Sequence, residues 1–185
     1  QGHCFRLLGQ AEKSREMLVQ ILEIEPDSPT ASFELARLDV DSGMYAEALK
    51  RLEPIVEKDP RHTEARYQLA IVLREQGRPE EAQAHFQKAR EINEKLASAN
   101  DLAERITPGP GSSDTRLEIA KIFLEYGSRR EGLMWLRSVL TFSPDHPGAL
   151  KELEAYYRKR FSEEPSSTRF NELADEYQRR LTASQ

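Results

Sequence analysis

The chain has 185 residues, of which 38% are hydrophobic and 32% charged, and its formal net charge is −5 at pH 7. This length allows one or two domains with a buried core, while neither half of the chain has the basic surplus on which nucleic-acid binding relies. The single cysteine, Cys4, excludes an internal disulfide framework, and no apolar run approaches the ~20 residues that cross a bilayer. We therefore expect neither a nucleic-acid nor a membrane partner.

A period of 34 residues runs through the chain and is marked by glycines and prolines. Equivalent glycines recur as Gly9, Gly43, Gly77 and, after an overrun of 16 residues, Gly127; the matching prolines are Pro26, Pro60 and Pro144. Apolar residues recur at helical spacing on both sides of each glycine, so each glycine is expected to separate two helices. The chain is thus predicted to be a series of helix pairs.

Small residues occupy matched positions in these helix pairs, where they let two helices approach closely. They are Ala36, Ala70 and Ala120 in the first helices, and Ala48, Ala82 and Gly132 in the second helices. Trp135, the only tryptophan, lies beside the matched Leu136 in a second helix. We expect its large ring in the core, and the alternative is an exposed anchor on the convex face.

The period, the glycines, the alanines and the closing proline together resemble the tetratricopeptide repeat family. The resemblance implies an all-α fold, an α-solenoid of helix–turn–helix repeats wound into a right-handed superhelix, in which the first helix of each pair lines a concave groove. It covers most of the chain. The expected organisation is a truncated repeat in 1–28, repeats in 29–62, 63–106 and 115–146, a linker in 107–114, and an atypical C-terminal repeat or cap in 147–185.

The beginning of the chain departs from this pattern. Counting back from Gly9 places Gln1 in the middle of a first helix, with Gly2 and Phe5 at its small and aromatic positions. We therefore interpret the polypeptide as a fragment of a longer protein.

The overrun lies in a segment without proline or glycine that extends from Glu80 to Thr107. Its apolar residues form a continuous helical stripe, so the second helix of this repeat is predicted to continue to about Ile106, a rod of about 40 Å at 1.5 Å per residue. The linker "TPGPGSSD" then ends the helix and acts as a hinge, and Ser112, Ser113 or Asp114 caps the next helix. The apolar residues in the extension of this helix are expected to be buried either by the following repeat or by another chain.

The sequence contains no recognisable catalytic or metal-binding motif. His62 and His146 share one repeat position, two residues after a proline, and are expected to be polar residues at helix starts. Neither they nor His85 have a partner at metal-ligand spacing, and no phosphate-binding glycine loop, nucleophile elbow or zinc-protease motif occurs. We therefore predict no enzyme activity, no cofactor and no metal.

The resemblance implies that a ligand contacts the exposed face of the first helices. The candidate partner-binding residues at these positions are Phe33, Arg37, Tyr67, Ile71, Arg74, Lys121, Lys151 and Arg158. Aromatic residues and arginine dominate binding hot spots; the alternative is that Phe33 and Tyr67 only pack against neighbouring helices. Some members of the family bind the C-terminal carboxylate of chaperones through asparagines, but Glu34 and Gln68 stand at those positions, and an acidic side chain would repel a carboxylate.

The leading interpretation is a non-enzymatic scaffold for protein–protein interaction, which captures a peptide or a helix of a partner protein in its groove. The alternatives are a module for self-assembly into a homodimer or for spacing other domains, and a regulatory domain of an enzyme outside this fragment. The segments "GRPEEA", "GLMWLRSVLTFSPDH" and "LEAYYRKR" are also similar to repeat arrays of bacterial exported proteins. That similarity implies a bacterial source and a periplasmic or exported location.

Overall fold

The structure is a computed structural model that describes the backbone of residues 2–183 and the side chains of residues 10–109 and 111–183. The described residues form helices joined by short turns, with no strand among them. They divide into two compact units, unit 1 (Gln1–Asn93) and unit 2 (Glu94–Gln185). The side chain of Phe5, which the sequence places at the aromatic position of a truncated repeat, lies outside the described residues.

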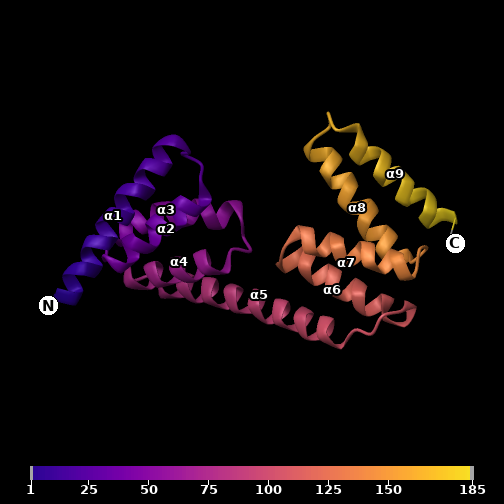
Figure 1. Ribbon diagram of the computed structural model, residues 1–185, viewed down its shortest axis with the longest axis horizontal. Helices are drawn as coiled ribbons and strands as arrows, with labels where there is room; N and C mark the ends of the chain where they lie inside the picture. Colours follow the sequence, from indigo (N-terminus) through magenta and orange to yellow (C-terminus); the bar gives the residue numbers. More distant parts are fainter. Residues whose placement is uncertain (1, 184–185) are drawn as a thin grey trace. The chain divides into compact units, whose positions relative to one another are not determined.

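Unit 1 is a stack of helices around one core (Figure 1). Its elements are α1 (Gly2–Ile24), α2 (Pro29–Asp41), α3 (Tyr45–Lys58), α4 (Thr63–Glu75) and the first part of α5 (Pro79–Arg105). Helix α2 contacts α1, α3 and α4, and α3 contacts α4. The alanines that were expected at close helix contacts are buried in this core, as the periodicity predicts: Ala36, Ala48, Ala70 and Ala82.

Two of the periodic glycines form the same turn in unit 1. Gly43 and Gly77 have φ values of 72° and 75°, a left-handed conformation that glycine adopts without steric cost. After Gly43, the amide of Met44 donates to the carbonyl of Asp39 at 2.8 Å; after Gly77, the amide of Arg78 donates to the carbonyl of Leu73 at 2.9 Å. Both helices therefore end in a glycine C-cap that pairs their last carbonyl groups.

Gly9 does not separate two helices, because α1 runs without interruption from Gly2 to Ile24. The prediction of a turn at this glycine was wrong. A glycine within a helix costs about 1 kcal/mol relative to alanine, and α1 contains Gly9 at that cost.

One buried carboxylate connects three helices of unit 1. Asp39 in α2 has a side chain that is 1% exposed, and it accepts hydrogen bonds from Arg15 of α1 and from Nε of Arg51 of α3, the latter at 2.9 Å. A buried charge is stable only when it is paired and hydrogen-bonded. The two arginines supply that pairing from opposite neighbours of α2, so this charge cluster fixes α1 and α3 against α2.

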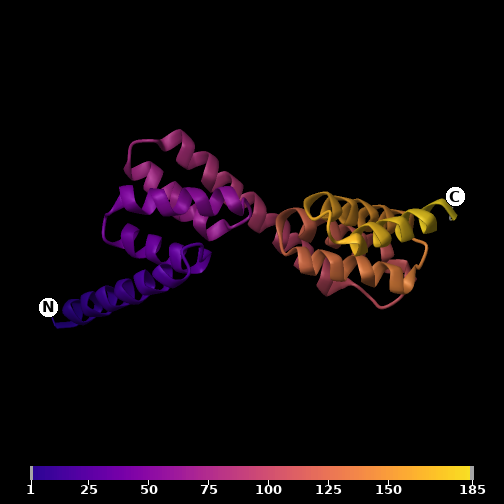
Figure 2. The ribbon, with the colours of Figure 1, turned by 90° about the horizontal axis from the view of Figure 1, so that it is seen from above.

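Unit 2 consists of the end of α5 and two helix pairs (Figure 2). Its elements are the short 3-10 helix η1 (Pro110–Ser112), α6 (Ser113–Tyr126), α7 (Arg129–Phe142), α8 (Pro147–Glu163) and α9 (Thr168–Ala183). Helices α6 and α7 pack against each other, as do α8 and α9, and α7 contacts α8. Ala120, Leu136 and Leu153 are fully buried in the core between them.

The long helix that the sequence predicts is present, because α5 contains 27 residues. The following repeat covers its apolar stripe: Ala99 is fully buried and packs with Ile119 and Phe123 of α6, while Leu96 and Ile106 lie against the same cluster. No second chain is needed for this cover. Trp135 is half-buried and contacts the same cluster, so it is part of the core, as expected, rather than an exposed anchor.

Gly127 and Gly132 are required for space rather than for backbone conformation. A Cβ on Gly127 would lie 2.7 Å from Cδ2 of Leu96, and a Cβ on Gly132 would lie 2.6 Å from Cγ of Leu124. Neither glycine has a positive φ. Gly77 and Gly127 hold equivalent positions in two repeats, but each is a glycine for a different physical reason.

The linker after α5 is stabilised by hydrogen bonds that involve Ser112, at its C-terminal end, and Arg116 of α6. The hydroxyl of Ser112 lies 3.0 Å from the carbonyl of Thr107 and 2.9 Å from that of Gly109, and it accepts from Nε of Arg116 at 3.1 Å. Ser112 stands at the N-cap of α6 but forms no side-chain cap, because its oxygen is engaged in the linker. The boundary between the compact units lies within α5 and not at this linker.

Candidate functional site

The candidate site in unit 1 begins with a hollow of about 660 Å³ between α2 and α4, here called the α2–α4 hollow. Its lining residues are Pro29, Thr30, Phe33, Glu34, Arg37, His62, Glu64 and Gln68. Both helices begin here: Pro29 occupies the first turn of α2, and His62 is the N-cap of α4. The hollow is therefore formed where the first helices of two successive repeats start side by side.

A second hollow of about 230 Å³ lies between α4 and α5, here called the α4–α5 hollow. It is lined by Thr63, Glu64, Tyr67, Gln68, Ala89 and Asn93. Glu64 and Gln68, one helical turn apart on α4, line both hollows. The two hollows therefore adjoin along α4, and we call them together the groove.

The groove is lined by one buried and one accessible aromatic residue. Phe33 is only 9% exposed, and its ring lies 4.9 Å from that of His62 between centroids. Tyr67 is 53% exposed, although the edge of its ring contacts Phe86 with centroids 5.1 Å apart. Phe33 thus belongs mainly to the packing of unit 1, whereas about half of the Tyr67 surface is accessible to a ligand.

His62 lies at a helix start, as the sequence predicted, and the structure shows that it caps α4. Its Nδ1 accepts a hydrogen bond from the amide of Ala65 at 3.2 Å, and this bond requires an unprotonated Nδ1 and leaves Nε2 as the donor. His146 caps α8 in the same way, through the amide of Ala149 at 3.4 Å. The shared repeat position of the two histidines therefore reflects capping of a first helix.

The charged residues of the groove are mostly acidic. Arg37 forms an ion pair with Glu34 at 3.1 Å, and the exposed Glu64 has a carboxylate oxygen 3.8 Å from Nδ1 of His62. Arg37 is the only arginine or lysine among the lining residues, against two glutamates. This balance disfavours an anionic ligand and favours one that is neutral or basic.

Two further candidates on α4 lie outside the groove. Ile71 is half-buried, and Arg74 is exposed and pairs with Glu75 at 3.3 Å. Neither lines the α2–α4 or the α4–α5 hollow.

The three candidates in unit 2 have separate environments. Lys121 of α6 forms an ion pair with Glu152 of α8 at 3.4 Å, and Lys151 is exposed. Arg158 donates to Glu154, Asn171 and Asp175, and the hydrogen bonds with Glu154 and Asp175 raise its pKa. Arg158 therefore joins α8 to α9, so its role in the structure is to hold the last helix pair together.

Sequence reasoning missed several residues that line the groove, namely Pro29, Thr30, His62, Thr63, Glu64, Ala89 and Asn93. Most of them lie in the first turn of a first helix or directly before it, one turn earlier than the positions taken from the repeat pattern. A signal was present, since Thr30 and Glu64 occupy equivalent positions 34 residues apart. Asn93 gave no such signal, because it enters the site only through the extension of α5.

No other chemistry is visible in the part of the chain that the structure describes. Among those residues, no three histidine, cysteine, aspartate or glutamate side chains are grouped so that they could hold a metal ion. Within the same residues, every helix falls short of the length or the apolar character that a membrane span requires.

Comparisons with known proteins place the repeats in a family. A family model described as tetratricopeptide repeat matches residues 6–59 and 39–106, whereas a search of curated proteins gave no significant match. Solved structures with similarity include MamA, at 15% identity over 97% of this chain and 89% of that chain, with a TM-score of 0.44. YrrB, described as a tetratricopeptide repeat protein with an unusual peptide-binding site, is 19% identical over 98% of this chain and 85% of that one, with a TM-score of 0.44.

A thermophilic tetratricopeptide repeat protein of Thermus thermophilus is 22% identical over 98% of this chain and 95% of that chain, with a TM-score of 0.35. The family model covers more than half of the sequence, and the helix pairs, the glycine C-caps and the buried alanines of unit 1 have the arrangement that this repeat requires. The chain belongs to the tetratricopeptide repeat family.

Proposed function

We propose that the chain is a non-enzymatic scaffold that binds an extended peptide of a partner protein along the groove of unit 1. Its family supports a role in protein–protein interaction. The observation that carries the finer proposal is the continuity of the two hollows through Glu64 and Gln68. A peptide that places one side chain in each hollow would pass directly over these two residues.

The groove offers the groups that peptide binding needs. Gln68 and Asn93 carry side-chain amides, which both donate and accept hydrogen bonds and therefore suit a peptide backbone. Tyr67 supplies an accessible ring of the type that dominates binding energy at interfaces. Glu34 and Glu64 disfavour an acidic peptide, so a neutral or basic sequence is the expected ligand.

Tyr67→Ala is expected to weaken peptide binding at least tenfold, which corresponds to about 1.4 kcal/mol. The physical reason is the loss of the exposed ring from the α4–α5 hollow. Peptides are first selected on the intact chain from a displayed random library, and the affinity of a selected peptide is then measured by calorimetry. Since half of the Tyr67 surface is already exposed, the melting temperature should change by only a few degrees.

A matched control is Gln83→Ala, because Gln83 is exposed on α5 and lines neither hollow. The control should bind within twofold of the parent chain. A selected peptide that binds Tyr67→Ala as tightly as the parent would show that it does not occupy the groove. A large loss of stability in Tyr67→Ala would instead assign this ring to the core.

Self-association through α1 is the second candidate function, and one observation favours it. Met17, Ile21 and Ile24 follow one another at helical spacing on α1, and they are 64%, 41% and 81% exposed. Exposed apolar stripes of this kind mark contact surfaces. A second copy of the chain, with the same stripe, would bury it in a symmetric dimer.

The double variant Met17→Gln and Ile24→Gln is expected to abolish any dimer that forms through α1. Light scattering after size exclusion at several concentrations measures this, with Cys4 replaced by serine in every sample so that no disulfide contributes. Glu23→Gln, an exposed change on the same helix, is the control. A parent chain that is monomeric at every concentration, or a dimer that persists in the double variant, would contradict self-association through α1.

A further inference from the structure

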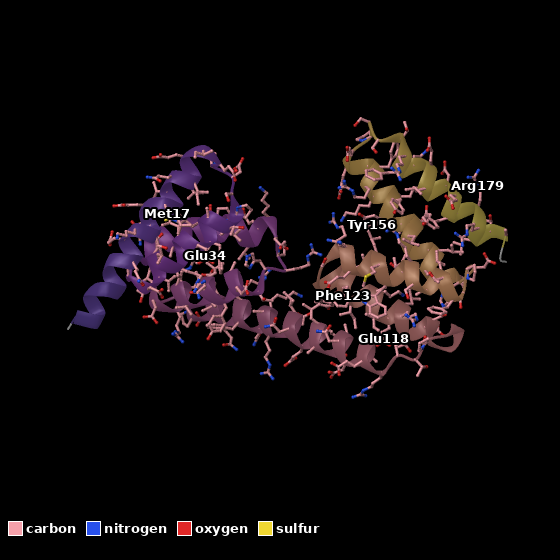
Figure 3. All side chains as sticks on the ribbon, viewed as in Figure 1. Met17, Glu34, Glu118, Phe123, Tyr156 and Arg179 are labelled. Carbon is pink, nitrogen blue, oxygen red and sulfur yellow. The ribbon has the colours of Figure 1, made fainter. Side chains whose placement is uncertain are left out.

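Unit 2 contains a hollow of about 260 Å³ that is separate from the groove of unit 1, here called the α8 hollow. It is lined by Leu124, Arg129, Glu152, Ala155, Tyr156, Lys159, Arg160 and Glu163. These residues come from the end of α6, the start of α7 and one face of α8. Tyr156, which lies on α8 (Figure 3), is half-buried with its ring edge against Tyr157. The volume suits one side chain rather than a larger ligand.

The carboxylates of the α8 hollow already have cationic partners. Glu152 pairs with Lys121 of α6 at 3.4 Å, and Glu163 pairs with Arg160 at 3.1 Å. Arg160 also pairs with Glu164, at 3.4 Å, and covers the ring of Phe170. The acidic groups and Arg160 are therefore neutralised within unit 2.

Two cations of the same hollow have no partner among the described residues. The side chains of Arg129 and Lys159 form no ion pair and no hydrogen bond there, and both residues are exposed. The hydroxyl of Tyr156 likewise has no hydrogen-bond partner within the described part of the chain. The hollow thus combines an apolar wall, from Leu124 and Ala155, with donors that lack acceptors.

Arg129 also stands where a helix disfavours positive charge. It is the first residue of α7, and Arg130 follows it. The dipole of the helix makes its N-terminus positive, so cations in the first turn are destabilising. Glu131, in the same turn, offsets part of this positive charge, and an anion in the adjoining hollow would offset more of it.

We propose that the α8 hollow is a second binding site, which takes a phosphorylated side chain of a partner protein. A phosphate carries a charge of about −1.5 to −2 at pH 7 and three acceptor oxygens, so it matches two free cations and a free hydroxyl. The guanidinium of Arg129 offers the paired N–H groups that phosphate oxygens accept. A single carboxylate would neutralise only one of the two cations.

The test measures binding of three blocked amino acids to the intact chain by NMR titration of a uniformly ¹⁵N-labelled sample. The compounds are N-acetyl-phosphoserine methylamide, N-acetyl-glutamate methylamide and N-acetyl-serine methylamide, with inorganic phosphate as a fourth probe. The phosphoserine compound should shift the amides around Arg129 and Ala155 saturably, and it should bind at least tenfold more tightly than each of the other three. It should bind more weakly at high salt.

The double variant Arg129→Gln and Lys159→Gln should lose at least tenfold of this affinity. The matched control, Arg130→Gln and Lys151→Gln, removes two exposed cations of unit 2 outside the hollow and should stay within twofold of the parent. All four residues are exposed, so both variants should retain the circular dichroism of the parent. Neither variant changes a residue of the groove, so this test does not depend on whether the groove binds a peptide.

Three results would overturn the proposal. One is the absence of a saturable shift around the α8 hollow with the phosphoserine compound. A second is equal binding of the phosphoserine compound and either the glutamate compound or inorganic phosphate, since the hollow would then not select a phosphorylated side chain. The third is unchanged affinity in the double variant.

Discussion

Replacing Asp39 with alanine is expected to lower the free energy of unfolding by about 2 to 3 kcal/mol. The change removes a fully buried carboxylate and leaves Arg15 and Arg51 without their shared partner. Breaking a buried ion pair typically costs about 3 to 5 kcal/mol. The expected cost is lower here because the two arginine side chains are 24% and 35% exposed and can regain contact with water.

Urea unfolding followed by circular dichroism measures this effect, and Asp41→Ala is the matched control. Asp41 lies on the same helix but is exposed, so its removal should change the free energy of unfolding by no more than about 0.5 kcal/mol. Because α2 carries Phe33 and Glu34, Asp39→Ala should also weaken binding of a groove peptide. Equal stability of the Asp39 and Asp41 variants would mean that the charge cluster does not hold α1 and α3 against α2.

Gly132→Val is expected to destabilise unit 2 by about 2 to 3 kcal/mol. A Cβ at this position would lie 2.6 and 2.7 Å from Cγ and Cδ2 of Leu124 and 3.0 Å from the backbone nitrogen of Leu124. The side chain can rotate away, but the backbone of α6 cannot, so α7 would have to move outward. Overpacking of a tight contact typically costs about 1 to 3 kcal/mol, and valine adds two methyl groups beyond Cβ.

The fluorescence of Trp135 reports this change directly, because it is the only tryptophan and lies on the same helix. Gly111→Val serves as the control, since a Cβ on Gly111 would meet no atom within 4 Å. The Gly132 variant should unfold at a lower urea concentration by this probe, and the Gly111 variant should not. Coincident transitions for both variants would show that α6 and α7 do not need the missing side chain.

The repeat pattern was a reliable guide to features that depend on local sequence. The absence of proline and glycine after Glu80, together with the apolar stripe, predicted the length of α5, because helix continuation depends on those local properties. The positions of His62 and His146 at helix starts were predicted for the same reason, and the structure adds that both cap their helices.

Features that depend on distant contacts were not predicted. The sequence does not show that Asp39 meets Arg15 and Arg51, because residues that are far apart along the chain create this buried cluster. The sequence also does not show that Gly77 is needed for its backbone conformation and Gly127 for space. The space around Gly127 is limited by Leu96, which lies on the extension of α5.

The sequence predicted some of the residues that line the groove, but it placed the candidate site about one turn too far along the first helices. The repeat pattern identified Phe33, Arg37 and Tyr67, which line the hollows, but extended the site to Ile71 and Arg74, which do not. The α2–α4 hollow lies at the starts of α2 and α4, and its depth depends on how the turns before these helices pack. The spacing of residues along the sequence does not show that packing.

The most direct test of the groove as a peptide-binding site is the position of a library-selected peptide on the chain, measured by intermolecular nuclear Overhauser effects. We expect contacts from the peptide to the rings of Phe33 and Tyr67 and to the side chains of Gln68 and Asn93. Contacts confined to Met17 and Ile24 of α1, or to unit 2, would contradict the assignment of the groove as the peptide-binding site.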